Sequence, residues 1–183
     1  VMAFFQFILM CLWLALPAAI ANMMPVFVLR VPFLNVPVDF GKTWRGKRIF
    51  GDHKTYRGFF FGVLGAIGVA YLQKTLYAYP SVQAISFIDF STVHFAVFGF
   101  LIGFGSLFGD LVKSFFKRRA NIAPGESWFP WDQLDLLFGA LLFVSFLKVP
   151  TWQMLVFYFI TVPLLHIFFN HLGYWLKIKE TKW

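Results

Sequence analysis

Charged residues are scarce in this sequence, and acidic residues are the scarcest. Only 13% of the 183 residues are charged, whereas a soluble domain has about 25%. Eight residues are Asp or Glu, and 60% of the chain is hydrophobic. This composition excludes a water-soluble globular domain. It predicts an all-α polytopic membrane protein, because helices satisfy their own backbone hydrogen bonds in lipid.

Cysteine and histidine are also rare. The one cysteine, Cys11, lies in an apolar run and cannot form an intrachain disulfide. There are four histidines. His166 and His171 are five residues apart, so they do not share a helix face as a metal-binding pair would. We interpret the histidines as structural. No Ser/His/Asp or Cys/His set is evident, so the sequence does not indicate a nucleophilic enzyme.

Long apolar runs dominate the rest of the chain. They predict one transmembrane domain, residues 1–183, with membrane spans at about 3–29, 58–74, 90–117, 131–148 and 150–176. The fourth span must include residues 131–135, because the twelve residues from Leu136 to Leu147 cannot cross about 30 Å at 1.5 Å per residue. Residues 19–21 resemble a signal-peptidase site. The preceding apolar run is longer than a signal sequence requires and has no basic start, so we expect a retained helix.

The basic residues predict the orientation of the chain. Fourteen of the sixteen Lys and Arg residues fall on one side of a five-span arrangement, and only Lys74 and Lys148 fall on the other. The positive-inside rule then places the N-terminus outside and the C-terminus inside. The charged loops 30–57 and 118–130 are therefore expected in the cytoplasm. We expect a multi-pass protein of the cell membrane with its functional site on the cytoplasmic side.

The first charged loop, 30–57, combines cations with glycines. Glycines at positions 41, 46, 51 and 58 allow tight turns and close approach of a ligand, and Lys and Arg suit phosphate oxygens. A topology signal alone would explain the charge but not the glycine spacing, and the two interpretations are compatible. The net charge of +8 fits a polyanionic substrate, anionic lipid or topology signals better than nucleic acid.

Residues 109–135 contain both signs of charge between two apolar runs. A charged residue costs about 2.5–3.5 kcal/mol at a helix centre, so such a cluster indicates a functional site. Asp110, Asp132 and Asp135 are predicted to meet at two helix ends, where carboxylate oxygens favour Mg²⁺ over zinc. Lys113 and Lys117 share the helix face of Asp110. These side chains together predict phosphoryl or nucleotidyl transfer at the membrane surface.

The motifs in this region resemble those of a known family. Gly109-Asp110-Leu111, Ser114, Lys117-Arg118 and Asp132-x-x-Asp135 are similar to the signature of the CTP:phosphatidate cytidylyltransferases. The resemblance is closer to the archaeal CDP-archaeol synthases. It extends over the loop Asp39-Phe-Gly-Lys-x-x-Arg-Gly-Lys-Arg-x-Phe-Gly-Asp52 and over Pro17-Ala-x-x-Ala-Asn22.

The resemblance implies five transmembrane helices and a reaction. CTP and an unsaturated archaeal ether-lipid phosphate, 2,3-bis-O-geranylgeranyl-sn-glycerol 1-phosphate, would give a CDP-lipid and pyrophosphate with Mg²⁺. It implies catalytic metal ligands at Asp110, Asp132 and Asp135. It implies phosphate contacts from Lys42, Arg45, Lys47, Arg48, Lys54, Lys113, Lys117 and Arg118. Asn22 and Asp52 are implied to contact nucleotide or order the loops.

The sequence departs from the bacterial members of the wider family. Ala123-Pro124 stands where a Lys-Asp pair is expected, Phe129-Pro130-Trp131 replaces a glycine-rich element, and Gln133 replaces an arginine. These differences favour the archaeal branch. Three alternatives remain open: a transporter with intramembrane carboxylates, a lipid or polyprenol kinase, and a non-catalytic scaffold. A transporter would place acidic residues on several spans near the midplane, and here they cluster at one boundary.

Overall fold

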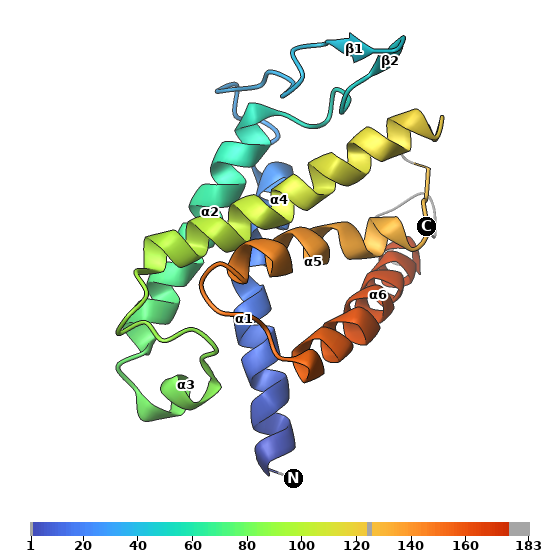
Figure 1. Cartoon of the computed structure of the whole chain (residues 1–183). Coiled ribbons are helices and arrows are strands. Elements are labelled where there is room, and N and C mark those ends of the chain that lie inside the picture. Colours follow the sequence, from blue (N-terminus) through green and yellow to red (C-terminus); the bar gives the residue numbers. More distant parts are fainter. Residues whose placement is uncertain (1, 124–125, 176–183) are drawn as a thin grey trace.

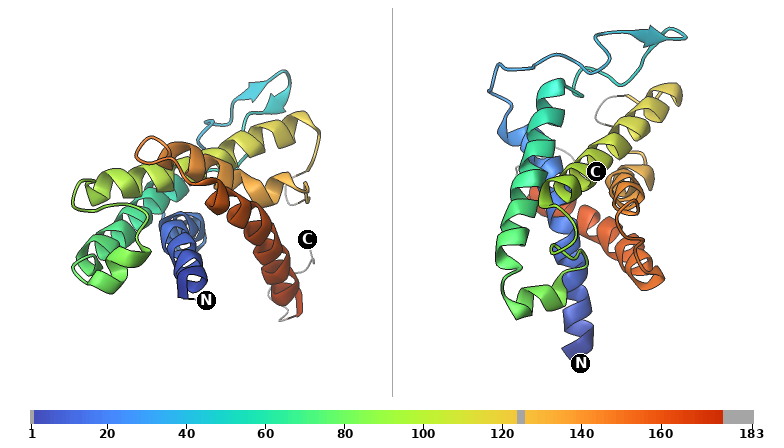
Figure 2. Two further views of the ribbon diagram at one scale, coloured as in Figure 1. Left: turned by 60° about the horizontal axis from the view of Figure 1, so that its bottom comes forward. Right: turned by 60° about the vertical axis from the view of Figure 1, so that its left-hand side comes forward.

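A computed structural model describes residues 2–123 and 126–175. Its elements are α1 (Met2–Phe27), β1 (Thr43–Trp44), β2 (Lys47–Arg48), α2 (Tyr56–Leu76), α3 (Pro80–Ile85), α4 (Phe95–Arg119), α5 (Trp131–Val144) and α6 (Trp152–Trp175). Helices α1 and α2 run side by side, α4 crosses them obliquely, and α5 and α6 form a V against α4 and α1 (Figures 1 and 2). The mostly helical architecture agrees with the sequence-based expectation.

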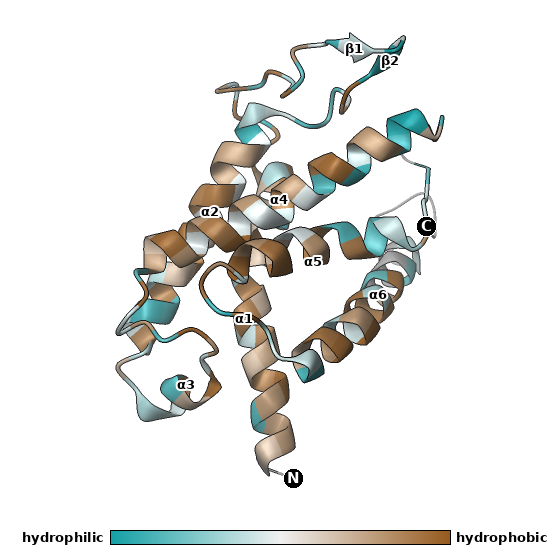
Figure 3. Cartoon of the chain, in the orientation of Figure 1, coloured by the Kyte–Doolittle hydropathy of each residue, from teal (hydrophilic) through white to brown (hydrophobic). Residues whose placement is uncertain are grey.

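Three of the described helices are long and apolar enough to cross a membrane: Ala3–Phe27, Tyr56–Leu76 and Phe95–Arg119. A shorter apolar helix covers Trp152–Phe168, and α5 has 14 residues. Each predicted span contains a helix. Helix α4 begins later than the predicted 90–117, at Phe95, and α5 is shorter than the predicted 131–148, because it ends at Val144. Hydrophobic residues cover the middle of the long helices (Figure 3), as expected for surfaces that face lipid.

Glycines on two faces of α4 place this helix at the centre of the structure. A Cβ atom on Gly103 would lie 2.5 Å from the Ala66 Cβ on α2. On another face of α4, a Cβ on Gly109 would lie 2.0 Å from the Asp135 carbonyl oxygen on α5. Because only glycine permits such approach, the backbones of α4 and α5 are in direct contact.

Two of the three glycines along the middle of α2 pack against α1. A Cβ on Gly62 would lie 2.8 Å from the Ala21 carbonyl oxygen, and one on Gly65 would lie 2.7 Å from Met24 Cγ, so both residues pack against α1. Gly68 has no described neighbour within 4 Å of such a Cβ. Gly68 therefore lies on another face of α2, while the contact with α1 continues to Gln73, whose side-chain amide donates a hydrogen bond to the Trp13 carbonyl oxygen at 2.6 Å.

A two-stranded hairpin lies within the first charged loop, where the sequence analysis predicted no strand. Thr43 pairs with Arg48 and Trp44 pairs with Lys47 in antiparallel register. Arg45 and Gly46 form the turn, with φ angles of 53° and 76°. Two successive positive φ angles are typical of a type I′ turn, whose twist suits a hairpin. The hairpin lies near the C-terminal end of α4, and the N-terminus lies at the opposite end of the molecule (Figure 1).

Lys148 and His94 each form a hydrogen bond with the backbone at the end of the molecule near α3. The Lys148 ammonium donates a hydrogen bond to the Phe87 carbonyl oxygen at 2.9 Å. His94 precedes α4 and its ring nitrogen accepts a hydrogen bond from the Ala96 amide at 3.2 Å. His94 thus caps a helix, which agrees with the structural role expected for it.

Candidate active site

The contact between α4 and α5 brings the predicted acidic residues together. Asp110 follows Gly109 on α4, and Asp135 lies where α5 meets that glycine. Asp132 lies one turn earlier, in the first turn of α5. The three carboxylates therefore meet because the glycines allow the two helix backbones to touch. The i and i+3 spacing of Asp132 and Asp135 places both of them on one face of α5.

The ammonium group of Lys113 lies among these three carboxylates. Its Nζ is 3.2 Å from Asp110 Oδ1, 3.0 Å from Asp132 Oδ1 and 2.8 Å from Asp135 Oδ2. The four side chains are mostly buried, and that of Asp135 is 3% exposed. Lys54 from the first charged loop also forms an ion pair with Asp110. The family resemblance implies a phosphate contact for Lys113, and no local sequence pattern predicts this central position.

The carboxylates are a suitable donor set for a hard divalent cation. In the described ranges, no group of three acidic, histidine or cysteine side chains is arranged to hold a metal ion as it stands. Instead, the three carboxylates converge on one cation, the Lys113 ammonium. Carboxylate oxygens around a shared cationic position fit Mg²⁺ or a similar ion once the ammonium moves aside.

A polar cavity of about 270 Å³ adjoins this cluster. Basic side chains from the first charged loop and from α4 line it, so it gathers positive charge from distant parts of the sequence. Its lining residues are Arg48, Phe50, Gly51, Asp52, His53, Lys54, Lys113, Ser114, Lys117 and Arg118. Six of these residues were predicted to contact nucleotide. The structure does not bring Lys42, Arg45 or Lys47 to this cavity.

Asp39 holds the loop that forms one wall of the cavity. Its buried carboxylate accepts hydrogen bonds from the amides of Gly41, Phe50 and Gly51 at 3.0, 2.9 and 3.1 Å, and from Arg48 at 2.7 Å. Burial opposes ionisation, but these hydrogen bonds hold the pKa of Asp39 well below its usual range. Asp39 is not among the predicted site residues. Its position two residues before a loop glycine is the signal that indicates such a turn.

Trp44 and Arg119 attach the hairpin to α4. The Trp44 ring stacks on Phe115 with centroids 5.5 Å apart, and the Arg119 guanidinium lies 4.3 Å from the Phe115 centroid. Arg45 lies over the outer part of this stack, 5.3 Å from the Trp44 centroid. Arg119 was not predicted as a site residue, because its partners are remote in sequence and its role depends on the fold.

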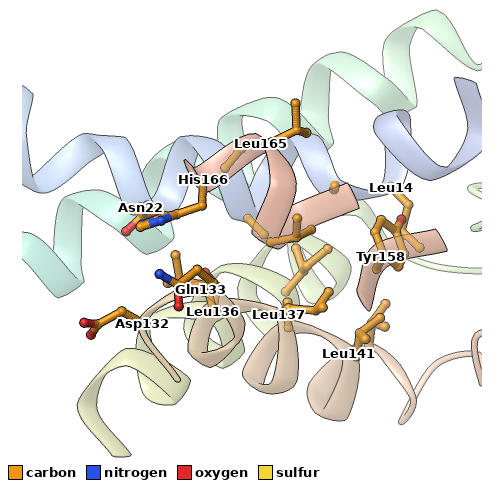
Figure 4. Close-up of a pocket in the computed structure, with 18 residues that line it drawn as sticks. Leu14, Asn22, Asp132, Gln133, Leu136, Leu137, Leu141, Tyr158, Leu165 and His166 are labelled. Carbon is orange, nitrogen blue, oxygen red and sulfur yellow. The ribbon is translucent and has the colours of Figure 1, made fainter. Parts of the chain in front are cut away.

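An apolar cavity of about 250 Å³ lies on the other side of Asp132, between α1, α4, α5 and α6. Leu14, Leu137 and Leu141 are among the residues that line it. Asn22 lines this cavity, and not the polar one, together with Gln133 and Asp132 (Figure 4). Asp132 therefore links the two cavities, because it lines the apolar one and its carboxylate forms ion pairs with Lys113 and Lys117 of the polar one.

Comparisons with known proteins match almost the whole chain. A family model described as CarS-like, CDP-archaeol synthase, matches residues 4–183. A CDP-archaeol synthase of Pyrococcus furiosus is 38% identical over 178 residues, which are 96% of this chain and 98% of that protein. One of Archaeoglobus fulgidus is 39% identical over 181 residues, again 96% and 98% of the two chains.

A solved structure supports the same relationship. It is described as an intramembrane enzyme for the biosynthesis of archaeal membrane lipids, and it is 33% identical to this chain. The match has a TM-score of 0.69 and covers 87% of this chain and 91% of the other. Sequence identity and fold thus indicate the same relationship over most of the chain.

Proposed function

Since the chain belongs to the CDP-archaeol synthase family and is a membrane cytidylyltransferase that uses CTP, we propose that it transfers CMP to an archaeal ether-lipid phosphate with geranylgeranyl chains. The observation that carries this proposal is the position of Asp132. This residue lines the apolar cavity and forms ion pairs with two lysines of the polar cavity. A lipid and a nucleotide can therefore meet at one carboxylate.

The polar cavity is the proposed site of the CTP triphosphate. Lys54, Lys117 and Arg118 line it, and charge-assisted hydrogen bonds from such groups to phosphate oxygens are strong. Asp52 forms an ion pair with Arg48, so its proposed role is to orient the loop. Lys42, Arg45 and Lys47 lie outside the cavity, which favours a supporting role over direct contact.

Asp110, Asp132 and Asp135 are the proposed ligands of Mg²⁺. When bound, the ion would neutralise phosphate charge and orient the reacting phosphorus. The protein contributes the position of the three carboxylates, which follows from the contact between α4 and α5. Lys113 lies next to the polar cavity, so its ammonium can move from the carboxylates to phosphate oxygens.

The lipid phosphate is the proposed nucleophile. Its second pKa is about 6, so at pH 7 it is largely a dianion and needs no general base. One of its oxygens forms a bond to the α-phosphorus of CTP, the bond between the α-phosphorus and the bridging oxygen breaks, and pyrophosphate leaves. The apolar cavity would hold part of the isoprenoid chains, because leucines and small side chains line it.

We also propose the membrane arrangement. The chain would cross the cell membrane five times, through α1, α2, α4, α6 and α5 extended by its flanking residues, because the 14 residues of α5 alone are too short. The N-terminus would lie outside and the C-terminus inside. The polar cavity would then face the cytoplasm, where CTP is available. Basic residues are concentrated around this cavity, whereas Lys74 and Lys148 are the only Lys or Arg residues at the far end of the described structure. This asymmetry supports that orientation.

Product analysis of the purified protein tests the proposal. Labelled CTP, Mg²⁺ and the geranylgeranyl ether-lipid phosphate should give labelled CDP-lipid and pyrophosphate. Asp132→Asn should abolish both products, and Asp89→Asn, remote from both cavities, should retain them. CDP together with a newly phosphorylated lipid would instead indicate a kinase. Folded protein that turns over no CTP and lipid pair would favour the transporter alternative.

A further inference from the structure

One end of the apolar cavity is polar but uncharged. Asn22 of α1 and Gln133 of α5 lie there with His166 of α6, next to Asp132 (Figure 4), and Ser106 of α4 also lines the cavity. Asn22 and Gln133 face one another across this end, whereas Leu137 and Leu141 lie further along it (Figure 4). Three helices thus contribute neutral hydrogen-bonding groups between the carboxylate cluster and the apolar part of the cavity.

Two of these groups are buried without a partner. Gln133 is 3% exposed and Ser106 is fully buried. Within the described part of the chain, neither Gln133 Oε1 nor Ser106 Oγ has a hydrogen-bond partner. Buried polar atoms are almost always hydrogen-bonded in proteins, so two unpaired atoms at one cavity indicate a ligand or water that completes them.

The position and chemistry of these groups define the ligand. Phosphate would lie at the Asp132 end and alkyl chains at the leucine end, so the intervening ligand segment is the linker between them. In an ether lipid this linker is glycerol with two ether oxygens, which accept hydrogen bonds and carry no charge. Amide and hydroxyl groups can donate to such oxygens. Rotation of the Gln133 amide by half a turn exchanges its donor and acceptor, so either can face the linker.

We propose that Asn22, Ser106 and Gln133 form a subsite for the glycerol ether linkage of the lipid phosphate, and that Gln133 determines selectivity for glycerol-linked acceptors. This inference rests on the proposed function. It assigns the three neutral side chains to the linker and not to the nucleotide. Sites that hydrogen-bond a substrate group discriminate strongly against analogues that lack it, because the polar protein groups are then left unpaired.

The test compares two acceptors that differ only in the linker. One is a dialkylglycerol phosphate with two ether bonds, and the other is a branched alkyl phosphate with the same two chains, in which CH2 groups replace both ether oxygens. In Gln133→Leu, we expect kcat/KM for the glycerol ether to fall about tenfold or more, as for a lost substrate hydrogen bond. The alkyl phosphate and the KM for CTP should change less than about twofold. Leu141→Ala, at the apolar end, should affect both acceptors alike.

Ser106→Ala provides a second variant that adds no volume to the core. Its kcat/KM for the glycerol ether should fall relative to that for the alkyl phosphate, but by less than in Gln133→Leu. Thermal unfolding checks that the variant is folded. Equal losses on both acceptors in Gln133→Leu and Ser106→Ala would overturn the inference, as would unchanged kinetics in both. If Gln133→Leu does not fold, the ratio of kcat/KM for the two acceptors in Ser106→Ala decides. A wild-type protein that forms no CDP-lipid from either acceptor would refute the proposed function itself, which separates the two failures.

Discussion

Lys47 and Arg119 carry the same charge, yet they join the hairpin to α4 through reciprocal hydrogen bonds. Lys47 Nζ donates to the Arg119 carbonyl oxygen at 3.1 Å, and Arg119 Nη1 donates to the Arg48 carbonyl oxygen at 2.7 Å. Each cation thus binds backbone of the other element, and the Arg119 guanidinium also lies on Phe115. The loop that brings Arg48 and Lys54 to the polar cavity therefore depends on the end of α4.

Arg119→Ala should weaken CTP binding without removing a lining residue of the cavity. The variant loses one hydrogen bond and its stacking on Phe115, so the hairpin should detach more often from α4. We expect the KM for CTP to rise about tenfold, the equivalent of roughly 1.4 kcal/mol, with a smaller change in kcat. Steady-state kinetics at saturating lipid measures this. Lys74→Ala is a control, and an unchanged KM in Arg119→Ala would show that the hairpin position does not matter.

Lys113→Met should destabilise the metal-free protein. It leaves Asp110, Asp132 and Asp135 close together without the shared ammonium, and breaking a buried ion pair costs about 3–5 kcal/mol. Thermal unfolding in detergent should show a lower midpoint than for wild type. Mg²⁺ should raise that midpoint more in the variant than in wild type, because the ion no longer competes with an ammonium. Equal midpoints without metal would contradict the central position of Lys113.

Asp39→Asn should loosen the wall of the polar cavity. The amides of Phe50 and Gly51 donate to the Asp39 carboxylate, so their hydrogen exchange should accelerate in the variant. The pKa of Asp39 is lowered in the folded protein. Its contribution to stability is therefore complete above the unfolded pKa of about 4. That contribution falls as pH decreases from there towards the folded pKa.

Protection factors of these two amides, measured against unfolded protein, should consequently decline in wild type below about pH 4 and converge on those of Asp39→Asn. Amides within α2 serve as the internal reference, since Asp39 does not hold them. Protection that is independent of pH in this window would contradict the proposed role of the carboxylate.

Gly109→Ala should disrupt the carboxylate cluster through the backbone. The added Cβ would lie 2.0 Å from the Asp135 carbonyl oxygen, so α5 must move away from α4. Overpacking of this kind costs about 1–3 kcal/mol. We expect a lower unfolding temperature and a loss of transferase activity. Gly68→Ala is the matched control, because its Cβ meets no described neighbour within 4 Å. It should be neutral or stabilise by about 0.4–1 kcal/mol.

The helices and the acidic residues of the site were predictable because they depend on local patterns. Apolar runs of about 20 residues indicate helices in lipid, and α1, α2 and α4 have that length and composition. The i and i+3 spacing of Asp132 and Asp135 places them on one face of a helix whatever else the chain does. Long-range contacts of single side chains follow no such pattern. Asp39, Arg119 and the hairpin at 43–48 therefore escaped prediction.

The sequence by itself determined the membrane class of the protein, the order of its helices and the residue types of its site. These follow from hydropathy, helix periodicity and charge. Only the tertiary structure decided which groups meet: Lys113 lies among three carboxylates, Asn22 lines the apolar cavity, and Lys47 contacts α4. The reason is the close approach of α4 to α5 at Gly109 and of α1 to α2 at Gly62. That approach sets distances between residues far apart in the chain, which no local pattern specifies.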